Sequence, residues 1–248
     1  GRKILRPYNM TIMTNEITDN LIKDIMYTGR LLWEKDLASA LNGNISARIN
    51  ESELLLTAHS ACLGLLQKSD VLKVNTQGEL LEEGQISTEK LLHTEIYLVF
   101  NDAQAVIHTH TVYTNAYFIT NNKLTPKIFE TKMCLGEVES IEQSTPAVTD
   151  VGPVLNSLES NNIVVLKNHG VVSKGKDLFD CFLLIQALEE AVTIDAVAQI
   201  YSQKNQAAKG DMSAPPPAPS QPKKYKLFSK EQMDGIVELV NDDPQMKE

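Results

Sequence analysis

A hairpin pattern near residue 50 constrains the fold more than any other feature of the sequence. The segments 45–49 (ISARI) and 53–58 (ELLLTA) are short and largely apolar, and only Asn50-Glu51-Ser52 separates them. Two such runs joined by a short polar turn are typical of a β-hairpin. A hairpin pairs its strands antiparallel, whereas a parallel pair needs a long crossover connection. The sequence therefore predicts a sheet that is not purely parallel.

Helical and strand-like segments alternate along the rest of the chain. Apolar residues recur at near-helical spacing through 15–40, and the LNGN sequence at 41–44 is expected to stop this helix. Further helices are predicted at 87–100, 111–121, 151–160 and 177–205, further strands at 70–74, 105–110, 162–168 and 170–175, and short strands and loops at 126–149. This alternation, together with the hairpin, indicates a layered α/β domain with a mixed sheet.

The composition changes near the C-terminus. Residues 207–224 are rich in proline and poor in large apolar side chains, as in a flexible or polyproline-like linker. A short helix is predicted at 229–240, and its apolar residues could dock on the body or on a neighbouring subunit. We therefore predict a main domain at 11–205, a proline-rich linker at 206–226, and a C-terminal helix and tail at 227–248.

Charge and hydropathy argue against two classes of partner. The formal net charge of −9 opposes generic nucleic-acid binding, which needs a basic surface. A small anionic substrate is still compatible, because a metal ion and oriented N–H groups can outweigh the global charge. No segment approaches the ~20 apolar residues of a membrane helix, and the first residues lack an apolar secretory segment. Membrane binding is therefore not expected.

The cysteines predict the compartment. Cys62, Cys134 and Cys181 are far apart and form no CxxC pair. Such scattered cysteines are typical of reduced thiols. We therefore predict a cytoplasmic protein.

His108-Thr109-His110 is the sharpest local feature, at the end of the apolar strand predicted at 105–110. Residues i and i+2 of a strand point to one face, so both imidazoles could chelate one ion. His169 follows another apolar strand and could supply a third ligand. Imidazole ligands suit zinc, which keeps one position open in catalytic sites. The alternative is that these histidines are ordinary hydrogen-bonding residues.

Glu89 is the candidate acid/base, at the start of the helix predicted from Ser87 to Phe100. Ser87 or Thr88 is the expected N-cap of this helix. Glu89 could also be a fourth metal ligand. His93 lies one helical turn further on and is interpreted as structural or as a support for the site.

Four motifs in order resemble the class II aldolase/adducin family, whose members include fuculose-phosphate aldolase. They are Gly43-Asn44-Ile45-Ser46, the stretch from Ser87-Thr88-Glu89 through His93 to Tyr97, the segment 105–110 (AVIHTH), and Asn168-His169-Gly170. The resemblance covers about residues 15–205. It implies a three-layer αβα single domain with a central mixed, largely antiparallel sheet. It also implies a homotetramer with active sites between subunits.

The resemblance also implies an activity. In the aldolases of this family, zinc held by residues matching His108, His110 and His169 polarises the substrate, and a glutamate at the Glu89 position acts as acid/base. The reaction implied is retro-aldol cleavage of a small ketose 1-phosphate, or a related hydroxy-ketone, to dihydroxyacetone phosphate and an aldehyde. Manganese or cobalt are the alternative metals.

The substrate contacts are predicted from the first and second motifs. The Asn44 amide, the Ser46 hydroxyl, and Ser87 and Thr88 with the N–H groups of the helix start could hold a phosphate. Gly43, in the first motif, and Thr57, at the end of the second strand of the hairpin, complete this predicted binding set. The alternative for Asn44 and Ser46 is a turn and cap after the first helix.

Several departures from the family pattern bear on the reaction. Glu89 favours an aldolase over a 4-epimerase, because the epimerases typically carry Asp at this position. The loop at 57–64 contains His59 and is longer than the TPSG-type loop of relatives, so a non-phosphorylated substrate is an alternative. A family tyrosine expected near 127–133 is absent. The alternatives are therefore a sugar-phosphate 4-epimerase, a methylthioribulose-1-phosphate dehydratase, or a non-catalytic adducin-like interaction module.

Overall fold

The computed structural model describes residues 7–143, 145 and 147–210, and side chains between residues 15 and 203 of these ranges. The chain divides into two compact units, Gly1–Ser202 and Gln203–Glu248. The first unit contains the sheet. Residues 206–210 of the predicted linker continue the last helix; the rest of the linker and the helix predicted at 229–240 lie outside the described residues.

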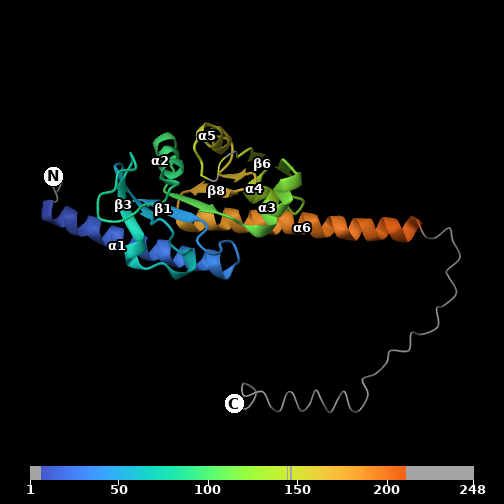
Figure 1. The fold of residues 1–248 in the computed structure, drawn as a ribbon, viewed down its shortest axis with the longest axis horizontal. Helices are drawn as coiled ribbons and strands as arrows, with labels where there is room; N and C mark the ends of the chain where they lie inside the picture. Colours follow the sequence, from blue (N-terminus) through green and yellow to red (C-terminus); the bar gives the residue numbers. More distant parts are fainter. Residues whose placement is uncertain (1–6, 144, 146, 211–248) are drawn as a thin grey trace, which may run out of the picture. The chain divides into compact units, whose positions relative to one another are not determined.

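Eight strands form one sheet in the described part of the chain (Figure 1). Their order is β3-β2-β1-β4-β8-β7-β6-β5, and among these neighbours β6 and β7 are the parallel pair. The strands are β1 Asn44–Arg48, β2 Glu53–Thr57, β3 Val71–Asn75, β4 Ala105–Thr109, β5 Lys123–Leu124, β6 Val138–Ile141, β7 Ile163–Leu166 and β8 Gly170–Gly175. The mixed, largely antiparallel sheet is confirmed, including the β1–β2 hairpin, in which Ala47 pairs with Leu55.

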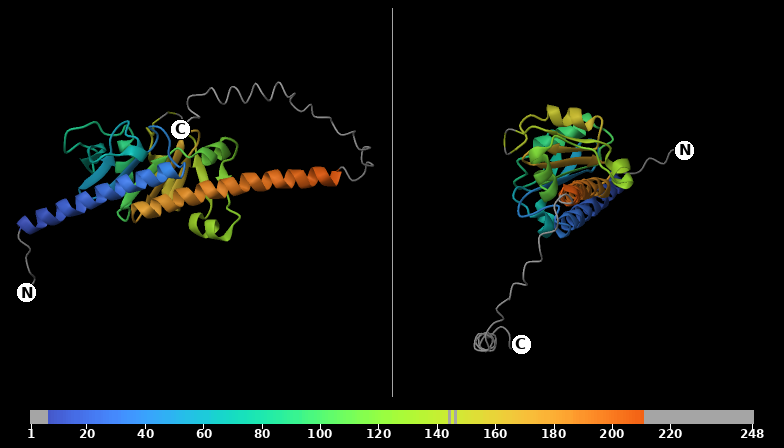
Figure 2. Two further views of the ribbon diagram at one scale, coloured as in Figure 1. Left: turned by 90° about the horizontal axis from the view of Figure 1, so that it is seen from below. Right: turned by 90° about the vertical axis from the view of Figure 1, so that its right-hand side faces the viewer.

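Helices cover both faces of this sheet (Figure 2). They are α1 Pro7–Glu34, α2 Lys90–Val99, α3 Val112–Thr120, α4 Phe129–Leu135, α5 Gly152–Leu158 and α6 Leu178–Gly210. Successive strand residues point to opposite faces. Val106 of β4 packs with residues of α2 and α5, whereas Ile107 packs with residues of α1 and α6. The predicted three-layer αβα architecture is therefore confirmed.

The first helix ends earlier than the predicted residue 40. The amide of Leu37 donates to the carbonyl of Leu32 at 2.8 Å, and the amide of Asp36 donates to that of Trp33 at 3.1 Å. Asp36 has φ +57°, so these bonds form a Schellman motif, in which Leu37 and Leu32 are both buried. The prediction ran too long because an aspartate, rather than the usual glycine, takes the left-handed position.

Helix α4 was not predicted within 126–149. Its large apolar residues Phe129 and Met133 are 82% and 87% exposed, while Thr131 and Leu135 are buried. The helix therefore shows no apolar stripe facing the core, which is the pattern that sequence periodicity detects. Gly136, with φ +60°, ends it.

No helix in the described part of the chain is both long and apolar enough to cross a membrane. The thiols of Cys62, Cys134 and Cys181 are all free. The cytoplasmic location stays a prediction.

Candidate active site

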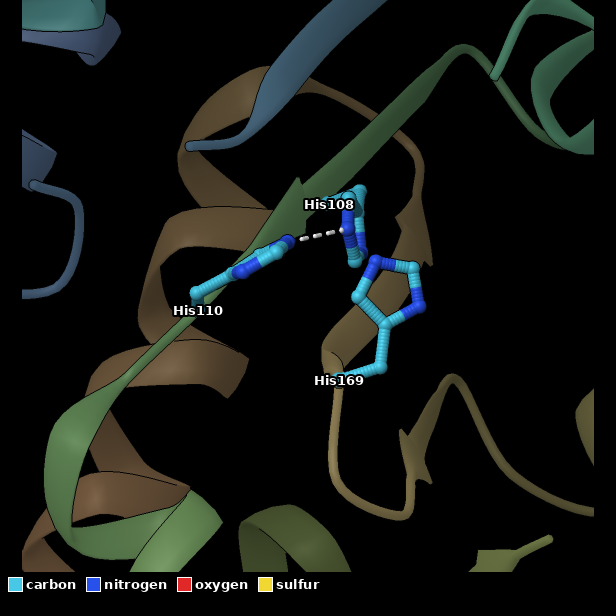
Figure 3. Close-up of side chains that lie close together, drawn as sticks. All are labelled: His108, His110 and His169. Atoms are coloured by element: carbon cyan, nitrogen blue, oxygen red, sulfur yellow. Dashed lines mark hydrogen bonds between the residues drawn. The ribbon is translucent and has the colours of Figure 1, made fainter. Parts of the chain in front are cut away.

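The three predicted histidine ligands meet in space. His108 lies near the end of β4, His110 directly follows this strand, and His169 lies in the turn between β7 and β8 (Figure 3). The ring centroids are 4.8 Å apart in each pair. One ring nitrogen from each lies within 4.8 Å of the others, and no second group of this kind occurs among the described residues. Residues separated by about sixty positions thus converge on one point.

The register of β4 and β8 produces this convergence. His108 pairs with Val172, so the β7–β8 turn returns the chain beside the end of β4. In that turn Asn168 has φ +59°, a left-handed conformation that asparagine tolerates better than most residues. A Cβ added to Gly170 would lie 2.3 Å from the carbonyl oxygen of Thr109. Asn168 and Gly170 therefore shape the backbone that carries His169.

The hydrogen bonds and burial of the cluster favour neutral imidazoles. Nδ1 of His108 lies 3.0 Å from the carbonyl oxygen of Val171, which can only accept, so Nδ1 carries the proton and Nε2 presents its lone pair. Burial lowers the pKa of His108 well below its ordinary value and that of His110 to about 4. Burial also lowers the pKa of His169. Neutral imidazole is the form that binds a metal ion.

These residues fit one divalent ion. Nε2 of His108 and Nε2 of His110 are 2.9 Å apart, so their lone pairs face the same point. Nε2 of His169 faces the same space (Figure 3), and Oε1 of Glu89 beside it is buried without a hydrogen-bond partner. Three nitrogen ligands with one position left open is the arrangement of catalytic zinc sites. The donor set therefore suits zinc better than the harder magnesium or calcium ions.

Glu89 faces the histidine cluster. Its Oε2 lies 3.2 Å from Nε2 of His108, and its Oε1 lies 3.5 Å from Nε2 of His169. The side-chain amide of Asn44 donates to Oε2 at 2.8 Å. Because Oε1 has no hydrogen-bond partner, the carboxylate keeps an acceptor site that is free to take a proton from a bound molecule.

A cavity of about 160 Å³ opens beside Glu89. The residues that line it are Leu41, Asn42, Gly43, Asn44, Ala58, His59, Ser60, Ser87, Thr88, Glu89, His110, Ala147 and His169. This set includes four of the predicted substrate contacts. Four larger surface hollows, of about 500 to 730 Å³, are lined by other residues and contain none of the three histidines.

The start of α2 differs from the prediction. The N-cap is Glu89, not Ser87 or Thr88, and its side chain makes no capping bond. Ser87 accepts the Glu89 amide through its Oγ at 3.2 Å. This bond fixes the backbone of Glu89, while Thr88 is exposed at the cavity.

Ser46 and Thr57 are not brought to the cavity. Both side chains are fully buried. Ser46 is hydrogen-bonded to His93 and Tyr97, and Oγ1 of Thr57 accepts the amide of Ile45 at 3.1 Å. Neither side chain lines the cavity in the described structure, because residues of α2 cover Ser46 and Thr57 bonds to β1, and their contact with a substrate stays a prediction.

Three further residues lie at or below the site, and of these His93 alone was assigned a role from the sequence, as structural or as a support for the site. His93 and Tyr97 are fully buried beneath Asn44, and His59 is exposed at the cavity. Glu89, His93 and Tyr97 follow one another at four-residue spacing on one face of α2, so a polar stripe on an otherwise apolar helix face was the available signal. No such sequence signal pointed to His59, because its loop follows no regular pattern.

Sequence comparisons agree with this geometry. The sequence model of the Class II Aldolase and Adducin N-terminal domain matches residues 23–196. An L-fuculose phosphate aldolase of Methanocaldococcus jannaschii is 32% identical over 167 residues, which are 65% of this chain and 87% of that protein. A methylthioribulose-1-phosphate dehydratase of Alcanivorax borkumensis is 25% identical over 206 residues, covering 77% and 94% of the two chains.

A solved structure shows the same fold. It is the L-fuculose-1-phosphate aldolase of Thermus thermophilus, with a TM-score of 0.68, 26% identity, and coverage of 74% of this chain and 96% of that one. The family match spans more than half of the chain and includes Glu89 and all three histidines. The chain is therefore a member of the class II aldolase and adducin family.

Proposed function

We propose that this protein is a metal-dependent aldolase that cleaves a small ketose 1-phosphate to dihydroxyacetone phosphate and an aldehyde. One observation carries the proposal: the Glu89 carboxylate faces the histidine triad, 3.2 Å from Nε2 of His108 and 3.5 Å from Nε2 of His169. Aldol chemistry needs a base beside the carbon whose proton an adjacent electrophile makes acidic. The short distances from Glu89 to these two ring nitrogens support a base beside the proposed electrophile.

Each group of site residues has a separate role in the proposed reaction. His108, His110 and His169 would hold zinc, or manganese or cobalt in its place, and the bound ion would act as a Lewis acid toward the substrate oxygens. In the synthetic direction Glu89 takes the proton from C3 of dihydroxyacetone phosphate, and in cleavage it returns that proton. Asn44 holds Glu89 in place through its hydrogen bond to Oε2.

A phosphate would lie among neutral donors. Gly43, Asn44, Ser87 and Thr88 line the cavity beside the start of α2. Among the described residues, no lysine or arginine lines it, and His59 is the one basic side chain there besides the proposed histidine ligands. This lining suits a small ligand with a single anionic group better than a diphosphate, because each added charge would need its own cation.

The experiment identifies products and metal together. Purified protein should contain close to one zinc per chain and should release dihydroxyacetone phosphate from at least one member of a ketose 1-phosphate panel. Removal of the metal with a chelator should abolish cleavage, and added zinc should restore it. Full activity in the metal-free protein would contradict the proposal.

One alternative enzyme function has specific support. A second methylthioribulose-1-phosphate dehydratase, of Pseudomonas syringae, is 39% identical over 95 residues, which are 38% of this chain and 47% of that protein, and segment 127–133 has no tyrosine. Loss of water without carbon–carbon cleavage in the same panel would select this reaction. An epimer formed without cleavage would select a 4-epimerase. A metal-free protein with a tight protein partner would select an adducin-like interaction module.

We also propose that the protein is a homotetramer in which a neighbouring subunit completes each site. The exposed apolar side chains of Phe129 and Met133 on α4 are compatible with a subunit contact. Light scattering should give the mass of four chains, and a monomer with full activity would contradict this assembly.

A further inference from the structure

A buried chain of hydrogen bonds runs from Glu89 into the space between α2 and β1. Asn44 Nδ2 donates to Glu89 Oε2 at 2.8 Å, and Asn44 Oδ1 lies 2.5 Å from His93 Nε2. His93 Nδ1 lies 2.6 Å from Ser46 Oγ, which lies 3.0 Å from the hydroxyl of Tyr97. All five residues are at most 7% exposed. His93, Ser46 and Tyr97, each at most 1% exposed, therefore have no water as an easy alternative partner.

The chemistry of these groups fixes the direction of every bond. An ionised carboxylate can only accept, so Asn44 must turn its NH₂ group toward Glu89 and its carbonyl oxygen toward His93. That oxygen can only accept, so His93 must carry its proton on Nε2 and leave Nδ1 as an acceptor. Ser46 must then donate to Nδ1, and Tyr97 must donate to Ser46. Each donor points toward Glu89.

We propose that His93 is a positioning residue that holds the Asn44 amide with its NH₂ group toward Glu89 and the cavity. The inference rests on the proposed role of Glu89 as the acid/base. With the amide reversed, its carbonyl oxygen would face the carboxylate, and both groups would repel. Asn44 also lines the cavity, so the same orientation keeps a second N–H available to a substrate. His93 thereby sets both the base and one substrate contact without touching either ligand.

A purely structural role predicts something different. If His93 only filled space, activity would not depend on which of its two ring nitrogens a substitution replaces. Any loss of activity would then follow the loss of stability. Burial lowers the pKa of His93 to about 3, so the ring is neutral at ordinary pH and needs no counter-ion. The two roles differ in whether the donor at Nε2 matters in itself.

Two substitutions separate the ring nitrogens. In His93→Gln the terminal amide reaches the position of Nε2 and can still donate to Asn44. In His93→Asn the shorter amide reaches the position of Nδ1 and serves Ser46 alone. We expect His93→Gln to keep kcat within about threefold of wild type, and His93→Asn to lose roughly 10- to 100-fold with unchanged zinc content. Ile96→Val, a fully buried change on the same helix, is the control for stability.

Equal losses in the two His93 variants, or losses that track the melting temperature as in Ile96→Val, would overturn the proposal. Heteronuclear NMR of the histidine ring nitrogens supplies a readout that needs no activity. The wild-type His93 signal, assigned by its absence in His93→Gln, should show a protonated Nε2 and a bare Nδ1 throughout the range from about pH 5 to pH 8. A proton on Nδ1 would overturn the inference even if the protein is an aldolase. If no ketose phosphate is cleaved, the proposed function fails while the NMR result still decides the orientation of Asn44.

Discussion

Gly170 offers a sharp test of how the backbone builds the histidine cluster. A Cβ at this position would lie 2.3 Å from the carbonyl oxygen of Thr109 and 3.0 Å from ring carbons of both His108 and His110. An ordinary carbon–oxygen contact is about 3.3 Å, so Gly170→Ala must separate the two strands locally by about 1 Å. The displaced carbonyl belongs to the residue between two proposed ligands. The substitution therefore moves the ligands themselves.

Gly170→Ala is expected to weaken metal binding more than it destabilises the fold. Forcing an extra methyl group into a packed site costs about 1–3 kcal/mol of stability. Ligand distances at a metal site tolerate about 0.2 Å, so a shift of this size should weaken zinc binding by roughly 10- to 100-fold. Competition with a chromophoric chelator measures the zinc affinity, and thermal melting of the metal-free protein measures the stability.

Gly175→Ala is the matched control at the other end of β8. Its Cβ would lie 2.9 Å from Oδ2 of Asp180 and 3.0 Å from Sγ of Cys181, far from the histidines in register. This variant should lose stability and keep its zinc affinity. Equal zinc affinity in the two variants would refute the argument that the close approach of Gly170 positions the ligands.

Three further predictions concern stability. The pKa of His93 is about 3 in the folded protein against an ordinary value of 6.5, so the unfolded chain binds the proton first as the pH falls. The free energy of unfolding of the metal-free protein should therefore fall by about 2 kcal/mol between pH 7 and pH 5 because of this group. Urea unfolding should show a shallower pH dependence in His93→Gln. Both carboxylate oxygens of Glu189 accept backbone amides at the start of α3, those of Tyr113 and Thr114, at 2.8 Å. Glu189→Gln should therefore cost about 1–3 kcal/mol in the same measurement, and an unchanged midpoint would contradict the role of this cap. Asp36 has φ +57°, so Asp36→Gly should raise the free energy of unfolding by about 0.5–1 kcal/mol, and a loss of stability would show that the aspartate side chain matters more than the backbone strain.

The central strands of the sheet could be predicted because each is a short run of mostly apolar residues. The apolar run at 105–107 predicted β4, and the spacing of His108 and His110 predicted that both rings share one face. The end of α1 could not be predicted in the same way, since Asp36 takes the left-handed position where a glycine is usual, and the buried Leu37 closes the helix end through its backbone bond to Leu32. Local pattern thus located elements better than their ends.

The sequence also did not predict which side chains of the site are buried and which reach the cavity. Asn44 and Ser46 were both predicted to contact a substrate because they belong to the first family motif, and they lie two residues apart on β1 and so share a face. The structure separates them, because Tyr97 and His93 of α2 lie over Ser46, while Asn44 stays at the cavity. Which of two residues on one face is covered depends on how a helix packs, and no local pattern encodes that.

The most direct test of the central claim is the activity of Glu89→Gln measured beside its zinc content. Glutamine keeps the shape and the position of the side chain but cannot take a proton, so kcat should fall by about 10²- to 10⁴-fold while zinc stays close to one per chain. Glu95→Gln makes the same change on the same helix outside the cavity and should leave both values unchanged. Wild-type activity in Glu89→Gln would contradict the account, because the carboxylate facing the triad would then have no part in the reaction.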